Sequence, residues 1–412
     1  MNTSTTGPHD DTPPSRRRSL RRGGLAVVAG LLAVAASVSG TFAPVSADQA
    51  AAESARSSPA LRLPAPTGTH PVGMTSVYLK DASRPDPWVP EMTARELMVS
   101  LWYPAKTSHG QRAPYLTPAE SELLLTDAGI SGVPLDALST VGTNAVRDAA
   151  PAGRRHGLPL VVLSPGFTKP RATLTALAED LASHGYLVAG IEHTYESAGT
   201  SFPDGRVATC VACEGDHDEA FWAKLGAGRA ADVSFVLDEL TGAHPVWKGA
   251  RLVDPSRIAM AGHSAGGAST VAVMVTDSRV RAGINIDGTA TSPVPEGGLS
   301  RPYLFLGTQA RHTPSQDPTW VRAWEHLTGW KRWLVVTGAE HASFTDIGLF
   351  ADQVGLDIGA ELPAARVTQL TRAYVRAFVD LHLRDTPQPL LAGPSPRNPE
   401  VQFCSVATLS CR

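Results

Sequence analysis

The sequence lacks an excess of charge of either sign. Its 412 residues include 36 Lys and Arg against 39 Asp and Glu, a formal net charge of −3, and no basic block lies beyond Arg22. This balance argues against a nucleic acid as partner. With 42% hydrophobic and 18% charged residues the chain does not resemble a disordered one. It is long enough to form one large α/β domain or two smaller domains around a sizeable core.

Cysteine is also scarce, and the chain shows no internal repeat. Cys210 and Cys213 form a C-x-x-C pattern, while Cys404 and Cys411 lie close to the end of the chain. Four cysteines allow three pairings, of which the local ones, 210–213 and 404–411, are the simplest. A zinc site would need four convergent ligands, and a thioredoxin-like motif would need a different sequence context. We therefore expect structural disulfides and no metal site.

The N-terminal segment has the composition of an export signal. Five arginines within 16–22 precede an uncharged stretch, 23–47, that is rich in Ala, Val and Leu. The stretch ends in PVSADQA, where small residues fit a cleavage site before Asp48. SRRRSL also resembles a twin-arginine signal. The alternative is an uncleaved membrane anchor, which the weakly hydrophobic, Ala/Gly-rich core disfavours. We expect a signal peptide over 1–47 and a secreted protein.

Beyond this signal the composition predicts three segments. An Ala/Ser/Pro-rich linker covers 48–68, a catalytic domain covers 69–386, and a Pro-rich tail with a disulfide covers 387–412. Within the domain, apolar strand patterns alternate with helical ones. The alternation predicts an α/β fold with a mostly parallel central sheet and helices on both faces. The strand patterns are LPLVVLS, YLVAGIEH, SRIAMAGH, RAGINID, RPYLFLGT and KRWLVVTG, and the main helical patterns cover 171–185, 217–240, 265–276 and 364–383.

One serine lies in a cluster of small residues between such a strand and such a helix. In RIAMAGHSAGG, Gly262 and Gly266 flank Ser264 with the G-x-S-x-G spacing. This pattern is typical of a nucleophile elbow, a sharp turn that exposes a serine hydroxyl at the carboxyl end of a sheet. We expect His263, inside the elbow, to pack beside the serine rather than act as its base.

A serine nucleophile requires a base, and the base requires an acid that orients it. In this sheet type the chain order is Ser, then Asp or Glu, then His. Asp287 ends the next strand pattern, RAGINID, and His341 lies in VVTGAEHASF, after the last strand. Glu340 is an alternative acid, but it is adjacent to the base and points elsewhere. His193 ends a different strand. We expect Ser264, Asp287 and His341 to be the catalytic residues.

An oxyanion hole in such a sheet uses two backbone amides. One belongs to the residue after the nucleophile, here Ala265, and the other to the loop after an early strand. The loop LSPGFTKP offers the amide of Phe167, next to a glycine, Gly166, that lets the backbone turn closely. A Pro-Gly turn is also an ordinary strand ending.

Three segments carry a resemblance to a known family. LVVLSPGFTKPRATLTALAEDLASHGYLVAGIEHTYESA (160–198), GHSAGG and NIDGT together resemble the plasma-type platelet-activating-factor acetylhydrolase group of α/β-hydrolases. The likeness covers about 70–385 and keeps the order and spacing of the motifs. Pro165 replaces the histidine usual before the oxyanion glycine, and neither cysteine pair is a hallmark of the family. Bacterial secreted proteins of this neighbourhood also resemble triacylglycerol lipases and cutinase-like polyesterases.

The resemblance implies the roles of individual residues. It places the triad on Ser264, Asp287 and His341 and the oxyanion amides on Phe167 and Ala265. It implies calcium-independent removal of short or oxidised acyl chains from the sn-2 position of phospholipids, through an acyl-enzyme and without a cofactor.

From the sequence we expect a secreted serine ester hydrolase acting on a small-molecule or lipid ester. The alternatives are a triacylglycerol lipase or cutinase-like polyester esterase and, from another class, a non-catalytic lipid-binding protein. Phe221 and Trp222 could form a transient contact with a lipid surface, although such a pair is more often half-buried core. The sequence indicates no oligomeric state.

Overall fold

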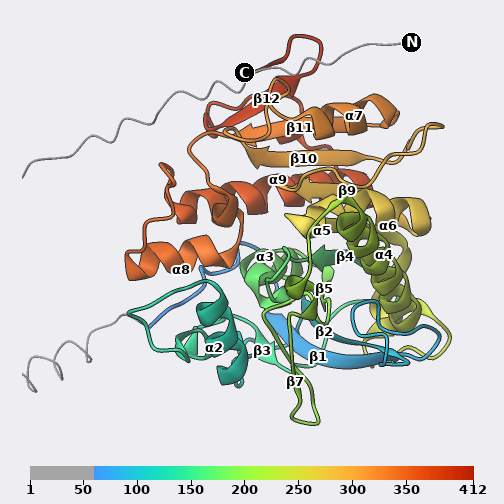
Figure 1. Ribbon diagram of the computed structural model, residues 1–412, viewed down its shortest axis with the longest axis vertical. Helices are drawn as coiled ribbons and strands as arrows, with labels where there is room; N and C mark the ends of the chain where they lie inside the picture. The colour runs from blue at the N-terminus through green and yellow to red at the C-terminus, as the bar shows by residue number, and fades with distance from the viewer. Residues whose placement is uncertain (1–59) are drawn as a thin grey trace, which may run out of the picture. The chain divides into compact units, whose positions relative to one another are not determined.

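An eleven-stranded sheet forms the centre of residues 60–412, the part of the chain that the computed structural model describes. Its order is β13-β12-β11-β10-β9-β8-β4-β5-β2-β1-β3, and Figure 1 shows it running from β12 at one end to β1 at the other. The strands are β1 (Val72–Asp81), β2 (Arg95–Pro104), β3 (Val146–Arg147), β4 (Leu158–Ser164), β5 (Leu187–Glu192), β8 (Val253–His263), β9 (Val280–Ile286), β10 (Tyr303–Thr308), β11 (Lys331–Val336), β12 (Val401–Ser405) and β13 (Ser410–Cys411).

The middle of the sheet is parallel. Neighbouring strands pair in parallel from β5 through β4, β8, β9 and β10 to β11. Every residue of β4 and β10 is buried, as expected for strands covered on both faces. The carboxyl ends of these strands therefore lie along one edge of the sheet, and the loops that follow them meet there.

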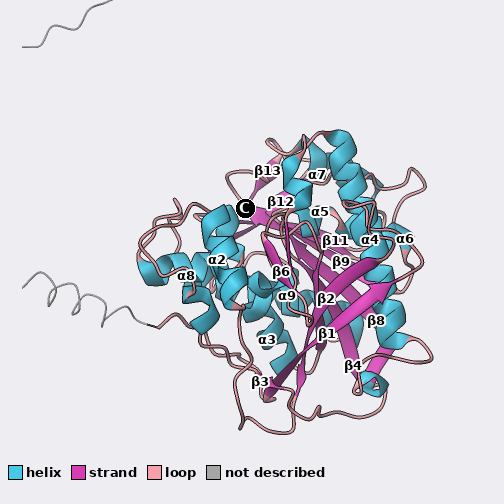
Figure 2. Cartoon of the chain, turned by 60° about the horizontal axis from the view of Figure 1, so that its bottom comes forward, coloured by secondary structure: helices cyan, strands magenta, loops and turns pink. Residues whose placement is uncertain are grey.

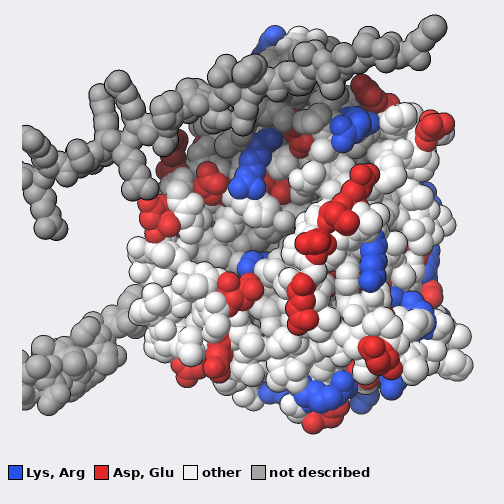
Figure 3. Space-filling model, in the orientation of Figure 1, with Lys and Arg blue, Asp and Glu red and all other residues white. Residues whose placement is uncertain are grey.

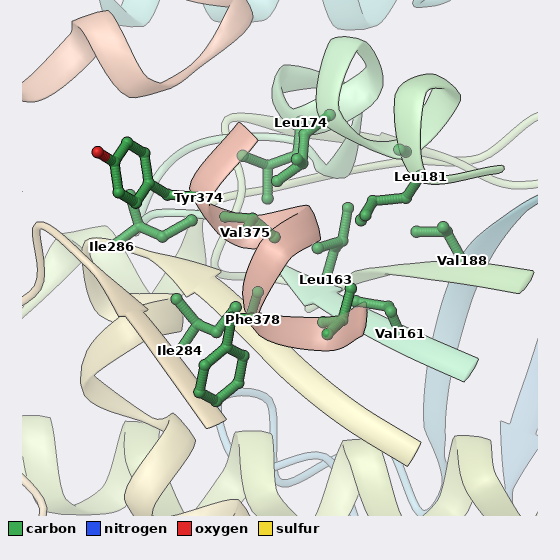
Figure 4. Packing of buried hydrophobic residues seen from close by; sticks show 14 of the residues in the cluster. Val161, Leu163, Leu174, Leu181, Val188, Ile284, Ile286, Tyr374, Val375 and Phe378 are labelled. Atoms are coloured by element: carbon green, nitrogen blue, oxygen red, sulfur yellow. The ribbon is translucent and has the colours of Figure 1, made fainter. Parts of the chain in front are cut away.

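Two helices, α3 (Thr175–Ser183) and α9 (Ala364–Arg384), cover one face of the sheet. Alternate strand residues such as Val161, Leu163 and Ile284 pack against Val375 and Phe378 of α9, as Figure 4 shows. Burying each such side chain contributes about 1.5–3 kcal/mol to the free energy of unfolding.

The other face is covered by α4 (Glu219–Thr241), α6 (Thr270–Thr276) and α7 (Pro318–His326). The intervening residues of the same strands, including Val162 and Met260, pack here against Val233 of α4 and Met274 of α6. Figure 2 shows the strands lying between helices. The structure thus confirms the predicted α/β fold with a mostly parallel sheet and helices on both faces.

The beginning of the described chain forms the antiparallel pair β1–β2. Helix α2 (Pro118–Asp127) begins with a capping box, in which Thr117 and Glu120 each accept a hydrogen bond from the other's backbone amide. The 3₁₀ helices are η1 (Ala137–Thr140), η2 (Arg171–Leu174), η3 (Val211–Glu214), η4 (Ala250–Leu252), η5 (His341–Phe344) and η6 (Pro389–Leu391), and the remaining helices are α5 (Ala265–Ala268) and α8 (Asp346–Val354).

Parts of the predicted linker and of the predicted tail belong to the folded core. The signal segment, 1–47, and most of the linker lie outside the described residues, but Leu61 and Leu63 of the linker are buried. In the predicted tail, β12 pairs antiparallel with β11 and so extends the central sheet. Within residues 60–412 no helix is long and apolar enough to cross a membrane.

Both cysteine pairs form the local disulfides that were expected. Cys210–Cys213 follows a small two-stranded sheet, β6 (Gly199–Ser201) and β7 (Val207–Thr209), and Cys404–Cys411 joins β12 to β13.

Acidic and basic side chains lie interspersed among uncharged atoms on the described part of the face in Figure 3, in keeping with the balanced composition.

Candidate active site

Ser264 occupies the sharp turn between β8 and α5. Its φ of 54° lies in the left-handed region, which is strained for a residue with a side chain. A hydrogen bond of 2.8 Å from its amide to the carbonyl of Ile286 in β9 helps to hold this conformation. The side chain is partly exposed, while its neighbours on both sides are buried. The strand-turn-helix predicted from the G-x-S-x-G spacing is therefore present.

The two glycines of the elbow are required by the closeness of the backbone. A Cβ at Gly262 would lie 2.2 Å from the carbonyl carbon of Gly266, and a Cβ at Gly266 would lie 2.0 Å from the carbonyl oxygen of Ser164. Real Cβ atoms do not approach backbone atoms so closely. The elbow thus packs directly on the end of β4, where the predicted oxyanion loop begins.

Asp287 and His341 lie side by side at the same edge of the sheet. Asp287 follows β9 with a φ of 53° and is 3% exposed. Its Oδ2 accepts a hydrogen bond of 2.5 Å from His341 Nδ1, and its Oδ1 accepts one of 2.6 Å from the Thr308 amide. Burial alone would raise the pKa of Asp287, but the hydrogen bond from His341 and the charge of His312 lower it to about 2. The carboxyl group is therefore ionised at neutral pH and fixes the ring, leaving Nε2 free.

His341 is held in turn by His263. His263 Nε2 donates to the His341 carbonyl at 2.9 Å, and the two rings lie 4.4 Å apart between centroids. Burial and the charge of His341 lower the pKa of His263 to about 3, so its ring is neutral. Its buried Nδ1 has no hydrogen-bond partner within the described chain. His263 thus packs beside the serine, as expected, and links the elbow to the histidine loop.

Ser264 comes to this pair through the elbow, which places it next to His263. No hydrogen bond joins the Ser264 hydroxyl to the His341 ring within residues 60–412. Such contacts often tighten only when substrate binds. The His341 side chain is 34% exposed and can therefore be reached from solvent.

The loop after β4 lies against the serine. A Cβ at Gly166 would be 3.4 Å from Ser264 Cβ, an ordinary van der Waals contact. Within residues 60–412, the amides of Phe167 and Ala265 donate no hydrogen bond to another residue. Ala265 is the first residue of α5, where an amide has no partner inside its own helix. Two backbone donors are thus available beside the hydroxyl.

An aromatic cluster borders this loop. The rings of Phe221 and Trp222 lie 5.4 and 5.8 Å from that of Phe167, and the Trp88 ring packs on Phe221 at 5.2 Å. Phe221 is only 9% exposed. The structure therefore favours the half-buried alternative for the Phe221–Trp222 pair, and the cluster forms an apolar wall that includes Ala265, the residue after Ser264.

Two further side chains bear on the assignment of the acid. Glu340 is the N-cap residue of η5, where its carbonyl accepts from the Ser343 amide at 2.9 Å and its own amide donates to Ser343 Oγ at 3.1 Å. His312 lies with Nε2 3.4 Å from Asp287 Oδ1 and bonds Asp317 through Nδ1 at 2.6 Å. Sequence reasoning missed His312, although its place just after β10 puts it at the same sheet edge. No group of acidic, histidine or cysteine side chains that could hold a metal ion occurs among the described residues.

The chain matches a known protein family and a solved structure. The family described as "Platelet-activating factor acetylhydrolase, isoform II" matches residues 55–223 and 246–360. The chain belongs to this family. The solved structure of a ferulic acid esterase from Streptomyces cinnamoneus superposes on this chain with a TM-score of 0.76 and 44% sequence identity. The superposition covers 84% of this chain and all of the esterase chain.

Curated relatives extend the comparison within the platelet-activating factor acetylhydrolase family. A probable 1-alkyl-2-acetylglycerophosphocholine esterase from Arthroderma benhamiae is 29% identical over 377 residues, which cover 83% of this chain and 93% of that protein. The platelet-activating factor acetylhydrolase of Cavia porcellus is 23% identical over 224 residues, 46% of this chain and 48% of its own length. The chain described here is therefore a carboxylic ester hydrolase.

Proposed function

We propose that this protein hydrolyses esters through an acyl-enzyme formed on Ser264, with His341 as general base and Asp287 as the acid that orients it. The observation that carries the proposal is the Asp287–His341 hydrogen bond at the sheet edge where the strained elbow holds Ser264. A serine hydroxyl is a weak nucleophile near neutral pH, so it needs such a base.

The reaction divides into two halves. His341 Nε2 takes the proton of the Ser264 hydroxyl as the oxygen attacks the ester carbonyl, and the amides of Phe167 and Ala265 hold the oxyanion. His341 then protonates the leaving alcohol as the C–O bond breaks. Water, activated by the same ring, attacks the acyl-enzyme and releases the carboxylic acid. This chemistry needs no metal or organic cofactor.

For the substrate we propose an ester with a short acyl group, in the first place the sn-2 acetyl group of a 1-alkyl-2-acetylglycerophosphocholine. The family and the Arthroderma benhamiae relative support this choice. The second candidate is a hydroxycinnamate ester. The 44% identity to a ferulic acid esterase and the wall of Phe167, Phe221 and Trp222 beside the oxyanion amides favour it, because aromatic rings pack well in edge-to-face contacts.

A substrate panel separates these candidates. The value of kcat/KM is measured for an sn-2 acetyl phospholipid, methyl ferulate, tributyrin, a polyester film and p-nitrophenyl esters of graded chain length. If the protein is an acetylhydrolase, as proposed, the acetyl phospholipid should have the highest kcat/KM. If the second candidate is correct, methyl ferulate should have the highest value. A lipase or cutinase would instead prefer tributyrin or the polyester film. Ser264→Ala should abolish turnover of every ester without unfolding the protein. A folded Ser264→Ala variant of full activity would contradict the proposed nucleophile.

We also propose that the protein is exported after removal of residues 1–47. The arginine-rich start, the uncharged stretch and the two disulfides support export, since disulfides persist in oxidising compartments. N-terminal sequencing of protein collected from culture medium should begin at Asp48. Recovery of the intact N-terminus from the membrane fraction would instead indicate an anchor.

A further inference from the structure

A buried arginine lies directly behind the oxyanion loop. Arg229, on α4, is 1% exposed. Its Nη1 donates to the Pro165 carbonyl at 2.6 Å and to Ser164 Oγ at 3.1 Å, while its Nε donates to Glu196 Oε2 at 2.7 Å. One guanidinium thus joins the end of β4 and the start of the loop to a carboxylate on another segment. Its planar fork of donors suits such a set of acceptors.

The loop is also held at its far end by the same carboxylate residue. The Thr168 amide donates to the Glu196 carbonyl at 2.8 Å, and Glu196 Oε1 accepts from the Trp88 indole at 2.9 Å. Phe167, whose amide is proposed to hold the oxyanion, lies between the two attachment points, Pro165 and Thr168. The positions of both ends therefore set the direction of the amide between them.

Three further side chains, His193, Asp232 and Arg95, hold the Ser164 hydroxyl that Arg229 contacts. His193 Nδ1 bonds Asp232 Oδ2 at 2.8 Å, and its Nε2 lies 2.9 Å from Ser164 Oγ. With Nδ1 donating to the carboxylate, Nε2 is an acceptor, so the Ser164 hydroxyl donates to it and accepts from Arg229. Asp232 is completed by Arg95, whose Nη2 lies 2.8 Å from Oδ2. Burial would raise the pKa of Asp232, but the charge of Arg95 and the hydrogen bond from His193 lower it strongly.

The backbone carbonyls of Ser164 and Pro165 also lie against the elbow. A Cβ at Gly266 would lie 2.0 Å from the carbonyl oxygen of Ser164 and 2.8 Å from that of Pro165. Helix α5, which carries the Ala265 amide, therefore packs on the backbone that Arg229 holds. The relative placement of the two oxyanion donors depends on where the Pro165 carbonyl points.

We propose that Arg229 is a positioning residue, which holds the Pro165 carbonyl away from the serine and so aims the Phe167 amide at the developing oxyanion. This inference rests on the proposed function. Without Arg229, the Pro165 carbonyl loses a charged donor and the loop can turn that oxygen or another toward the site, where it repels negative charge. Because fixed dipoles stabilise the transition state more than the substrate, the loss should fall on kcat rather than KM.

The alternative is that Arg229 only balances buried charge, which would make its removal a matter of stability. A double variant separates the two roles. Arg229→Met with Glu196→Gln removes both charges, and the glutamine keeps an acceptor for the Trp88 indole. If the role is positioning, this folded variant loses kcat by about 100- to 1000-fold, as when one oxyanion donor is lost, with little change in KM.

Two more measurements complete the test. A trifluoromethyl ketone, which forms an oxyanion on the serine, should bind the double variant more weakly by the same factor as kcat/KM falls. Arg229→Lys keeps the charge but not the fork, so its kcat should lie between that of the wild type and that of the double variant. Arg301 provides the control: it is partly buried and donates to the carbonyls of Asp277 and Val280 at the opposite edge of the sheet. Arg301→Gln should lower the melting temperature and leave kcat unchanged.

The outcomes are distinct. A folded double variant with wild-type kcat and ketone affinity overturns the proposal. If the double variant does not fold, a wild-type kcat for Arg229→Lys overturns it instead. Loss of stability alone, in the manner of Arg301→Gln, overturns it as well. If Ser264→Ala keeps full activity in the same assay, the proposed function has failed instead, since no serine oxyanion would then form.

Discussion

At the scale of single residues, the pair Asp287–His341 carries the assignment of acid and base. Asp287 is buried, ionised and bonded to the ring, while Glu340, the alternative acid, caps η5. We predict that Asp287→Asn lowers kcat by about 10⁴, because an amide can hold the ring in the wrong tautomer. Glu340→Gln, one residue from the base, is the matched control and should change kcat little. Equal losses in the two variants, measured on a p-nitrophenyl ester, would contradict the assignment.

His263 should make the folded state sensitive to acid. Burial depresses the pKa of its ring to about 3, below the ordinary value of 6.5. Below pH 6.5 the His263 ring is protonated in the unfolded chain, but in the folded protein it stays neutral until about pH 3. The free energy of unfolding therefore decreases as the pH falls through this window. The slope from this one group approaches about 1.4 kcal/mol per pH unit.

We predict that His263→Gln, whose amide can still donate to the His341 carbonyl, has a shallower slope. The free energy of unfolding is measured by urea titration between pH 4.5 and 6.5, a window above the titration of Asp287, whose pKa is about 2. Parallel curves for wild type and variant would show that His263 does not carry this pH dependence.

The placement of Ser264, Asp287 and His341 at one edge of the sheet could be predicted from the sequence, because each follows a strand pattern in a fixed chain order. His312 and Arg229 could not. Their positions depend on how a loop after β10 and one face of α4 pack against the site, and neither residue belongs to a local motif. Long-range side-chain contacts of this kind leave no periodic signal in the chain.

At the scale of elements, the elbow and the oxyanion loop form one packed unit. Sequence reasoning placed the close turn at Gly166, but a Cβ there would meet only ordinary contacts at 3.4 Å. The tight approach is at Gly266, where α5 meets the end of β4. The G-x-S-x-G spacing marks Gly266 as part of the elbow, but the sequence does not show that this glycine packs against the Ser164 carbonyl at the end of β4.

We predict that Gly266→Ala is severely destabilising or inactive, since its Cβ would lie 2.0 Å from the Ser164 oxygen and must displace either α5 or β4. The control is Gly297→Ala, where nothing lies within 4 Å of the added atom. Thermal melts and kcat are compared for both variants. A Gly266→Ala variant with wild-type stability and activity would show that the elbow has more room than the structure gives it.

Several elements were missed by pattern alone. Helix α7 begins at Pro318, directly after the capping residue Asp317, and α8 begins after the capping residue Thr345. Both caps are readable signals, yet the helices have only nine residues each, too few for a clear periodicity. Strand β12 lies in a Pro-rich segment and forms because β11 offers it an edge.

At the scale of the whole molecule, the C-terminal segment completes the sheet. Val401 of β12 is 2% exposed, and β12 pairs with β11, the strand that leads to His341. The Cys404–Cys411 bond closes the hairpin of β12 and β13. A loop of this size corresponds to about 2.5 kcal/mol of lost chain entropy in the unfolded state.

We predict that Cys404→Ser with Cys411→Ser lowers the free energy of unfolding by about 2 kcal/mol and leaves kcat nearly intact. The control is Cys210→Ser with Cys213→Ser, which closes a shorter loop and should cost less. Denaturant titrations of the purified proteins measure both. An unchanged midpoint in the first variant would mean that β12 is held by its pairing with β11 alone.

The parallel pairing of the central strands followed from the alternation of apolar runs and helical patterns, since that alternation permits few other folds. Their order in the sheet was not predicted. The extension of the sheet by β12 and the burial of Leu61 and Leu63 did not follow, because they depend on long-range docking of segments with weak local patterns. Domain limits drawn from composition thus miss segments that join the core by tertiary contact.

The account rests on one chemical event, attack by the Ser264 oxygen. The most direct test treats the folded protein with a fluorophosphonate, follows residual esterase activity and locates the adduct by peptide mass spectrometry. The account predicts one adduct per chain, on Ser264, forming at the same rate as activity is lost, and no labelling of Ser264→Ala. An adduct on another residue, or full activity after complete labelling of Ser264, would contradict it.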